Sequence, residues 1–384
     1  MRKILAAAFA ATALGAATAL GAAMASGPVD GGVGMLPARS ALAEEVHLFH
    51  NWILMPIITA ISLFILALLL WIILRFNSKA NPTPQKFSHN TAIEVVWTVI
   101  PIVILLGIAL PSFDLLYKED VVPDGKQVVA QGNGTTVDFA LANAFSENRR
   151  VTRPEHIQVL VSSTEGDRRL ARGADYKLAG LGKDEVRVTL TKAPAAGERV
   201  IIRGGRSLVG VGKIFGLYGE DRREIALAPT VTLKVTGFQW GWLYSYPDFG
   251  DFEFSANPLS EEEAAPGLYR FDTDNHVIVP LGETIRVTTT ARDVIHSWAM
   301  PNFAIKVDAV PGRINETWFN ADKEGHYYGQ CSEICGVKHS FMPIAIEVVS
   351  RPKFEAWVDS QRAQAGLAPM FDASSVKLAQ ASGE

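Results

Sequence analysis

Apolar residues concentrate in three blocks before residue 118, and most of the chain beyond them is more polar, with short alternating runs. The first block begins with two basic residues, continues as an Ala/Leu run and reaches Ala23-Met24-Ala25, a small-x-small cleavage site. This predicts a secretory signal peptide over residues 1–25, with an uncleaved membrane anchor as the alternative. Residues 26–45 are rich in Gly, Pro and Ala without a period, which predicts a flexible lead.

The second and third apolar blocks are long enough to cross a lipid bilayer. Residues 52–74 form an almost uninterrupted apolar run, and residues 95–117 form another that contains Pro101 and Pro111. A membrane-spanning helix needs roughly 20 apolar residues and tolerates proline. Residues 46–123 are therefore expected to form a transmembrane helical hairpin.

The charges around the two spans predict which side of the membrane each end faces. The loop between the spans carries Arg75, Lys79 and Lys86, whereas the outer flanks are mainly acidic. Positive loop residues stay in the cytoplasm. Both termini and everything after Tyr117 are therefore expected on the periplasmic side of a bacterial inner membrane, which the signal peptide predicts independently.

Residues 124–228 form a section rich in Gly, Arg and Thr, with short alternating runs such as His156 to Val161, Val186 to Leu190 and Val200 to Arg203. Gly, Pro or charged residues bound each run, so we predict an inserted β-rich module that resembles a small β-sandwich. The section contains no cluster of ligand or nucleophile residue types. This favours a structural or protein-contact role over a catalytic one.

After Pro229 the period-two alternation of apolar and polar positions returns. Strands are expected at Val231 to Val235, Tyr269 to Phe271, His276 to Val279, Thr284 to Thr289, Asn315 to Phe319 and Met342 to Val349. Their number and spacing fit an all-β Greek-key barrel of cupredoxin type over residues 229–351. A short amphipathic helix at about 352–363 would close the barrel, and residues 364–384 are predicted to be a disordered tail.

Composition narrows the classes of function. The length of 384 residues predicts two or three domains, and a hydrophobic share of 48% is enough to form their cores. Its net charge of −4 provides no basic surface for nucleic acid, so no nucleic-acid partner is expected.

The two cysteines of the chain, Cys331 and Cys335, lie in one short loop with His339 and Met342. Two cysteines in an exported protein most often form a disulfide, but a bridge across so short a loop would stabilise little. A disulfide would also not explain why His339 and Met342 lie in the same loop. Thiolate, imidazole and thioether together are the donors that copper prefers, so the loop predicts a copper site.

The number of donors distinguishes one copper ion from two. A mononuclear blue-copper site uses one Cys, two His and a weak Met, and this loop has one thiolate more. Two bridging thiolates suit two ions, each completed by one imidazole, so a second histidine is needed. His296 is the candidate, although such a histidine on its own is more often a core or hydrogen-bonding residue.

Several motifs carry a family resemblance. They are Gln239-Trp240-Gly241-Trp242, His296-Ser297-Trp298, Asp308-Ala309-Val310-Pro311-Gly312-Arg313 and the loop from Cys331 to Met342. Together with the hairpin, these motifs resemble subunit II of the haem-copper cytochrome c oxidases. The resemblance covers about residues 46–117 and 229–357, and residues 124–228 have no counterpart in the shorter family members.

The resemblance implies a dinuclear CuA centre. The positions that match its ligands are Cys331 and Cys335 (both bridging), His296, His339, Met342 and the backbone carbonyl of Glu333. The side chain of Glu333 would reach a Mg²⁺ ion at the interface with the catalytic subunit. Haem would belong to that partner alone, because this chain lacks the intramembrane histidines that its ligation needs.

The resemblance also implies roles for three residues outside the centre. Trp240 matches the surface tryptophan that takes up electrons from docked cytochrome c, although an aromatic at a strand end is more often part of a core. Asp274 matches a docking carboxylate. Glu94 matches the glutamate at the mouth of a proton channel of the catalytic subunit, although an acid at a helix start often serves only the helix dipole.

We therefore expect the electron-accepting subunit of a cytochrome c oxidase, which passes electrons from cytochrome c to the haem of the catalytic subunit for oxygen reduction coupled to proton translocation. The expected partners are subunit I and subunit III, cytochrome c and the lipid bilayer. A quinol-oxidase subunit would not need the copper donors, and a nitrous-oxide-reductase-like enzyme would need many more than the 8 histidines present. A membrane-tethered copper electron-transfer or copper-delivery protein is the remaining alternative.

Overall fold

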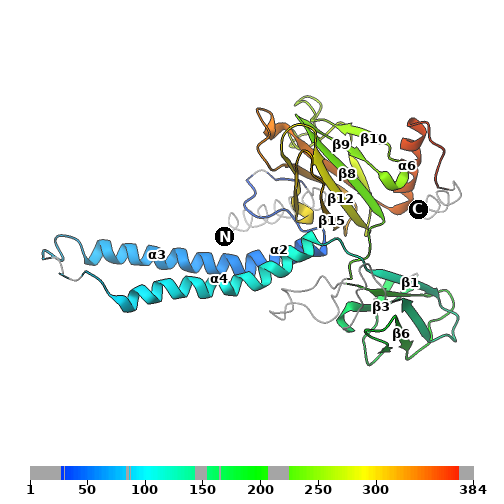
Figure 1. The fold of residues 1–384 in the computed structure, drawn as a ribbon, viewed down its shortest axis with the longest axis horizontal. Helices are drawn as coiled ribbons and strands as arrows, with labels where there is room; N and C mark the ends of the chain where they lie inside the picture. The colour runs from blue at the N-terminus through cyan, green and yellow to red at the C-terminus, as the bar shows by residue number, and fades with distance from the viewer. Residues whose placement is uncertain are drawn as a thin grey trace, which may run out of the picture.

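The computed structural model describes residues 27–29, 31–83, 86, 88–142, 154–163, 166–205 and 225–371. The predicted signal peptide and the part of the predicted tail after Phe371 lie outside this range. Within it, a long helical hairpin projects from two β-rich bodies, the larger of which carries the C-terminal helix (Figure 1).

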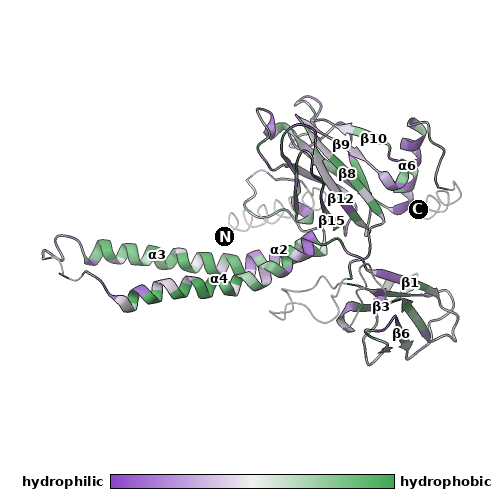
Figure 2. Cartoon of the chain, viewed as in Figure 1, coloured by the Kyte–Doolittle hydropathy of each residue, from purple (hydrophilic) through white to green (hydrophobic). Residues whose placement is uncertain are grey.

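The hairpin has two long helical arms. The first joins α2 (Ala41–Leu48), the π-helical segment η1 (Phe49–Leu54) and α3 (Met55–Arg75), and the second is α4 (Thr91–Asp120). Both arms are long and apolar enough to cross a membrane, and Figure 2 shows that most of their length is hydrophobic. Most of these apolar side chains are exposed. A helix that is apolar all round needs a lipid or protein environment. The hairpin therefore anchors the protein in a membrane, as predicted.

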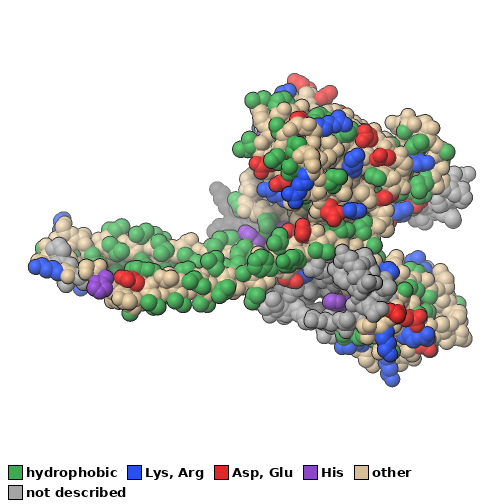
Figure 3. Space-filling model, viewed as in Figure 1, with side chains coloured by type: hydrophobic (Ala, Val, Ile, Leu, Met, Phe, Trp, Pro, Cys, Tyr) green, Lys and Arg blue, Asp and Glu red, His purple; other side chains and the backbone are tan. Residues whose placement is uncertain are grey.

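The tip of the hairpin is charged. Basic side chains gather there (Figure 3), where α3 ends at Arg75 and the loop that follows contains Lys79. Asn90 caps α4 by accepting a hydrogen bond from the N–H of Ile93 at 3.3 Å. The apolar part of each arm is thus bounded by polar residues at the tip, as expected of a membrane span.

The flexible lead predicted over residues 26–45 is wrong for residues 37–45. Ser40 Oγ accepts a hydrogen bond from the N–H of Ala43 at 3.0 Å, which caps α2, and donates to the carbonyl of Phe303 at 3.3 Å. Asn302 Nδ2 donates to the carbonyl of Pro37 at 2.9 Å. These bonds to the barrel fix the segment before the first span, which composition alone does not predict.

The barrel is fastened to the outer end of the hairpin. An apolar cluster joins the two parts and consists of Leu42, Phe49, Leu115, Ala226 and Trp318. Trp318 Nε1 donates to the carbonyl of Lys118 at 2.9 Å, and Thr317 Oγ1 donates to the carbonyl of Glu119 at 3.2 Å. Both bonds join the barrel to the last turn of α4, and they fix the position of the barrel relative to the membrane-spanning part of that helix.

The barrel consists of two five-stranded sheets with the orders β10-β9-β8-β12-β15 and β11-β17-β16-β13-β14. The strands are β8 (Val231–Phe238), β9 (Gly241–Ser245), β10 (Glu253–Ala256), β11 (Val277–Pro280), β12 (Thr284–Ala291), β13 (His296–Met300), β14 (Ile305–Ala309), β15 (Asn315–Asn320), β16 (Gly325–Cys331) and β17 (Pro343–Val349). Strands β8 and β12 pair in parallel, as do β11 and β17, and the remaining pairs are antiparallel. The predicted cupredoxin-like barrel is confirmed.

The alternation of apolar positions decides which side chains fill the barrel. Val231, Leu233 and Val235 are fully buried, as the period-two pattern predicts. The strand predicted at Tyr269 to Phe271 is wrong, because this segment is a turn in which Arg270 has φ 71°. A left-handed backbone angle interrupts a strand.

Helix α6 (Arg351–Gln364) covers one end of the barrel. It buries Phe354 and Val358, and its first residue, Arg351, contacts Glu283 at 2.9 Å. The chain after the helix still packs on the barrel, since the Phe371 ring lies 6.1 Å from the Phe249 ring between centroids. The predicted disordered tail therefore does not begin at residue 364.

The inserted module has two antiparallel sheets around one apolar core. One has the order β1-β7-β3-β4, with β1 (Lys126–Gln131), β7 (Arg199–Gly204), β3 (Ile157–Ser163) and β4 (Gly166–Arg169). The other has the order β2-β6-β5, with β2 (Asp138–Ala142), β6 (Glu185–Leu190) and β5 (Tyr176–Ala179). The three strand runs found in the sequence correspond to β3, β6 and β7. A structural rather than catalytic role for the module stays a prediction.

Candidate metal centre

Pairing of β13 with β16 brings the distant histidine to the cysteine loop. Trp298 of β13 is opposite Cys331 of β16, so His296, two residues earlier, lies beside the strand end where Cys331 begins the loop. The N–H of Ser332 donates to the carbonyl of Ser297 at 2.9 Å, and the N–H of Cys331 donates to the carbonyl of Met342 at 3.0 Å. These bonds close the loop on itself and on β13.

The six predicted ligand groups, five from this loop and His296 from β13, lie close together. The two sulfur atoms of Cys331 and Cys335 lie 3.9 Å apart. Cys331 Sγ is 4.0 Å from His296 Nδ1 and 3.3 Å from the carbonyl oxygen of Glu333. Cys335 Sγ is 3.6 Å from His339 Nδ1 and 3.9 Å from Met342 Sδ. Each sulfur thus has one imidazole and one weak donor beside it.

This donor set fits a pair of copper ions. A disulfide would hold its sulfur atoms at about 2.05 Å, and the separation of 3.9 Å leaves both thiols free. Copper prefers thiolate and imidazole, and takes thioether or carbonyl as a weak axial donor. Because His296 and Met342 are fully buried, the centre is held within the barrel end rather than displayed on its surface.

The protonation of the two thiols differs. Burial favours the neutral form of Cys331, but contacts with His296, the backbone and His339 outweigh it and lower its pKa to about 6. At Cys335, burial and the negative charge of Cys331 raise the pKa to about 12. The protein alone therefore favours one thiolate, and a bound cation is what would let both sulfurs ionise together.

Asp293 is a site residue that the sequence reasoning missed. Its Oδ1 lies 2.9 Å from His296 Nε2, and its Oδ2 accepts a hydrogen bond from the N–H of Gln239 at 2.7 Å. Although partial burial raises the pKa of Asp293, hydrogen bonds with His296, Gln239 and Val294 lower it overall. A carboxylate that holds one nitrogen of a histidine turns the other toward a metal, and here Nδ1 faces the sulfur.

Trp240 is bonded directly to the cysteine loop. Its Nε1 donates to the carbonyl of Cys335 at 3.2 Å, and Gln239 Nε2 donates to the same oxygen at 2.7 Å. The indole is half-buried and packs on the barrel core. Gly336 makes this contact possible, because a Cβ at that position would lie 3.1 Å from the ring and its φ of 119° disfavours other residues.

Asp274 lies near Trp240 but outside the centre. Its carboxylate is exposed and accepts hydrogen bonds from the N–H of Asn257 at 2.8 Å and from its Nδ2 at 3.0 Å. Asn257 in turn borders Gly241, since a Cβ on that glycine would lie 3.1 Å from Asn257 Oδ1. Asp274 is thus separated from the Trp240 turn by a single side chain.

Two of the predicted residues are directed away from the sulfur atoms. The side chain of Glu333 is exposed, although its carbonyl faces Cys331. Glu94 lies in the first turn of α4, at the tip of the hairpin, where its Oε1 accepts a hydrogen bond from the N–H of Asn90 at 3.4 Å. Neither side chain belongs to the centre.

Comparison with known proteins gives a consistent result across the chain. Residues 28–115 match the family described as cytochrome c oxidase subunit II, transmembrane domain, and residues 231–349 match the periplasmic domain of the same subunit. The probable cytochrome c oxidase subunit 2 of Rickettsia bellii is 35% identical over 337 residues, which are 88% of this chain and 86% of the relative. Cytochrome c oxidase subunit 2 of Cereibacter sphaeroides is 29% identical over 353 residues, with 87% and 82% covered.

A solved structure is also similar to part of this chain. It is the periplasmic domain of subunit II of cytochrome oxidase of Bradyrhizobium japonicum, which is 46% identical. The similarity covers 36% of this chain and 99% of that domain, with a TM-score of 0.34 over the whole comparison.

Proposed function

Because the chain belongs to the cytochrome c oxidase subunit II family, we propose that it accepts electrons from cytochrome c at a dinuclear CuA centre and passes them to the haem of the catalytic subunit. The observation that carries this proposal is the convergence of two free thiols 3.9 Å apart, each beside one imidazole and one weak donor. Members of this family are subunits of an oxidoreductase, cytochrome c oxidase. We place the reduction of oxygen and the coupled proton translocation in the catalytic partner subunit.

The residues of the centre have separate roles in this proposal. Cys331 and Cys335 would hold the metal pair through their thiolates, His296 and His339 would each supply an imidazole, and Met342 and the Glu333 carbonyl would act as weak donors. When bound, two copper ions sharing two thiolates would spread one electron over both, so reduction would change the geometry little. The paired strands and the loop bonds hold the donors in place, which further limits rearrangement.

Electron uptake is proposed at Trp240. The half-buried indole donates a hydrogen bond to the carbonyl of Cys335, a bridging ligand in the proposal, so the ring is linked to the centre through one contact. Asp274, next to this turn, would attract the basic docking face of cytochrome c. Its effect would be on association more than on the transfer step, since exposed charges act mainly on encounter rates.

The partner contacts follow from the hairpin and the loop. We propose that the hairpin crosses a bacterial inner membrane, with both termini and the barrel on the periplasmic side and with subunits I and III beside it. The exposed side chain of Glu333 would reach a Mg²⁺ ion at the interface with subunit I. Glu94, at the opposite end of α4, would lie at the mouth of a proton channel in that subunit.

Copper analysis combined with electron paramagnetic resonance (EPR) tests the proposal. The full chain, purified in detergent and supplied with copper, should hold two copper ions that share one unpaired electron, with hyperfine structure from two equivalent nuclei. A single exchangeable copper would instead indicate a delivery protein. A metal-free chain with a Cys331–Cys335 disulfide would overturn the proposal.

The Asp293→Asn variant should bind copper less tightly, by about 10- to 100-fold, because loss of a carboxylate behind a metal-bound histidine has this effect. Asparagine keeps the size of the side chain but loses the charge that holds His296 Nε2. Copper affinity measured by competition with a chelator checks the expectation. Asp251→Asn, at an exposed position with φ 54° that asparagine tolerates, is the matched control. Equal affinities in the two variants would exclude Asp293 as a positioning residue.

A further inference from the structure

A second group of metal-binding side chains lies on the outer surface of the barrel. It consists of His276, which immediately precedes β11, His326 on β16 and Glu347 on β17. One ligand atom from each residue lies within 4.8 Å of the others. His326 is exposed and the other two are half-buried. The group is distinct from the cysteine loop, because His326 precedes Cys331 by about 16 Å along the strand, at roughly 3.3 Å per residue.

The register of the sheet builds this group. His326 is directly opposite Glu347, and Val277, the residue after His276, is opposite Ile346. Neighbouring positions along each strand point to opposite faces. Since Tyr327 and Ile346 are fully buried, the side chains of His326 and Glu347 face outward together.

A carboxylate outside the group holds one of its imidazoles. Asp272 Oδ1 lies 2.6 Å from His276 Nε2 and also accepts a hydrogen bond from the N–H of Thr273 at 2.9 Å. This contact occupies Nε2 and leaves Nδ1 of His276 for a ligand. Histidines that bind metals usually donate their other nitrogen to such a partner. The second imidazole stands edge-on to the first, with ring centroids 5.4 Å apart and an interplanar angle of 73°.

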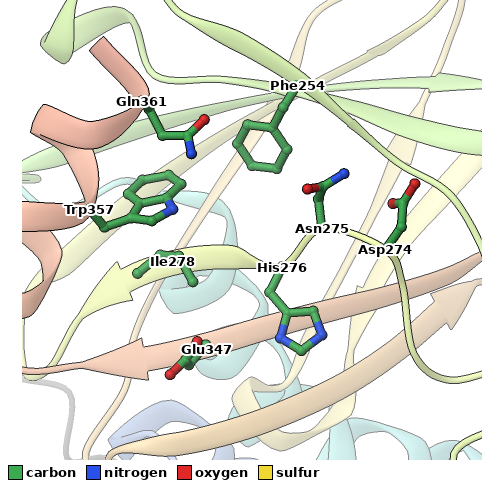
Figure 4. Close-up of a pocket in the computed structure, with 8 residues that line it drawn as sticks. All are labelled: Phe254, Asp274, Asn275, His276, Ile278, Glu347, Trp357 and Gln361. Atoms are coloured by element: carbon green, nitrogen blue, oxygen red, sulfur yellow. The ribbon is translucent and has the colours of Figure 1, made fainter. Parts of the chain in front are cut away.

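The group has access to solvent. A surface pocket of about 330 Å³ is lined by His276 and Glu347, together with Asp274 and Trp357. Figure 4 shows the imidazole of His276 and the carboxylate of Glu347 along one edge of this pocket. The pocket leaves room on that side for water molecules that complete a metal's coordination.

We propose that His276, His326 and Glu347 bind one divalent cation of the zinc type, with water as the fourth ligand. Two imidazoles and one carboxylate are a donor set of Zn²⁺, and tetrahedral zinc holds such atoms about 3.3 Å apart. The ligand atoms of the three residues, all within 4.8 Å of one another, are already close to that spacing. The absence of a thiolate separates this set from the cysteine loop, which copper prefers.

The cation would join three neighbouring segments of one sheet. It would tie β16 and β17 to the residue that leads into β11 and would offset the charge of Glu347. Strand β16 ends at Cys331, and the loop of the copper donors runs from there into β17. The surface site would therefore brace the two strands from which that loop emerges.

Calorimetric titration of the full chain with Zn²⁺ tests this site, with the cysteine loop first filled with copper so that its thiols do not compete. We expect the His326→Gln variant to lose more than about 100-fold in affinity, which exceeds the loss expected from a supporting residue. Asp272→Asn, which removes only the support of His276, should lose about 10- to 100-fold. His156→Gln, on the inserted module, is the matched control and should bind Zn²⁺ like the unchanged chain.

The copper EPR signal serves as a check on folding in every variant and should stay unchanged. Undiminished Zn²⁺ affinity in His326→Gln, or an equal loss in His156→Gln, would overturn the proposal. If His326→Gln also lost its copper signal, Glu347→Gln would decide, since it removes the charge and keeps the shape. Full Zn²⁺ affinity in a folded Glu347→Gln chain would equally overturn the site.

Discussion

Replacing Cys335 by serine should abolish the shared-electron copper signal of the full chain. Cys335 Sγ lies 3.9 Å from Cys331 Sγ, 3.6 Å from His339 Nδ1 and 3.9 Å from Met342 Sδ, so one sulfur contacts donors from both halves of the loop. Serine keeps the size of the side chain, but its hydroxyl is a hard donor and cannot replace the soft thiolate that copper prefers. Copper analysis and EPR should find at most one copper per chain.

The control for this variant is Ser332→Ala, which changes an exposed side chain of the same loop and leaves the backbone bond from Ser332 to Ser297 in place. It should retain two copper ions and their shared electron. If the Cys335→Ser chain also retained both, the thiols would not act as a bridging pair, and the proposed centre would be wrong.

Donor chemistry explains why the ligand group was predictable from the sequence. The loop contains one thiolate more than a single copper site uses, which required a second histidine far away in the chain. The structure brings His296 to the loop through the pairing of β13 with β16, so that His296 Nδ1 lies 4.0 Å from Cys331 Sγ. The number of available donors thus predicted a contact that no local pattern contains.

The supporting residues could not be selected in this way. Asp293 is one of 40 acidic residues, and only its distance of 2.9 Å from His296 Nε2 distinguishes it from the others. The only signal in the sequence is its place three residues before the histidine. The surface group of His276, His326 and Glu347 was missed for the same reason, since strand register rather than spacing along the chain brings its members together.

Predictions of local conformation were accurate where one strong force acts and failed where tertiary contacts decide. The hairpin was predicted because a bilayer demands long apolar helices. The segment at residues 37–45 was missed because its order comes from bonds to Phe303 and Asn302, which belong to the distant barrel. The segment from Tyr269 to Phe271 has strand-forming residue types, but the left-handed backbone of Arg270 turns the chain there.

Replacing Trp240 by phenylalanine should slow electron transfer from reduced cytochrome c by about tenfold, which corresponds to about 1.4 kcal/mol of activation free energy. Phenylalanine can keep much of the ring packing but has no N–H, so the 3.2 Å contact from Nε1 to the carbonyl of Cys335 is lost. Rapid-mixing measurements of copper reduction in the assembled complex check this. The copper EPR signal should be unchanged, which would separate a slower route from a damaged centre.

Glu94→Ala is the complementary variant, because Glu94 and Trp240 lie on opposite sides of the proposed membrane span. Helix α4 alone, from Thr91 to Asp120, extends about 45 Å at 1.5 Å per residue. In the assembled complex, Glu94→Ala should lower the rate of steady-state oxygen consumption. The rate of copper reduction by cytochrome c should stay the same, because the proposed proton channel begins at the opposite end of α4 from the copper centre. Normal oxygen consumption would leave Glu94 with no role beyond its bond to Asn90. An unchanged reduction rate in Trp240→Phe would remove the indole from the electron route.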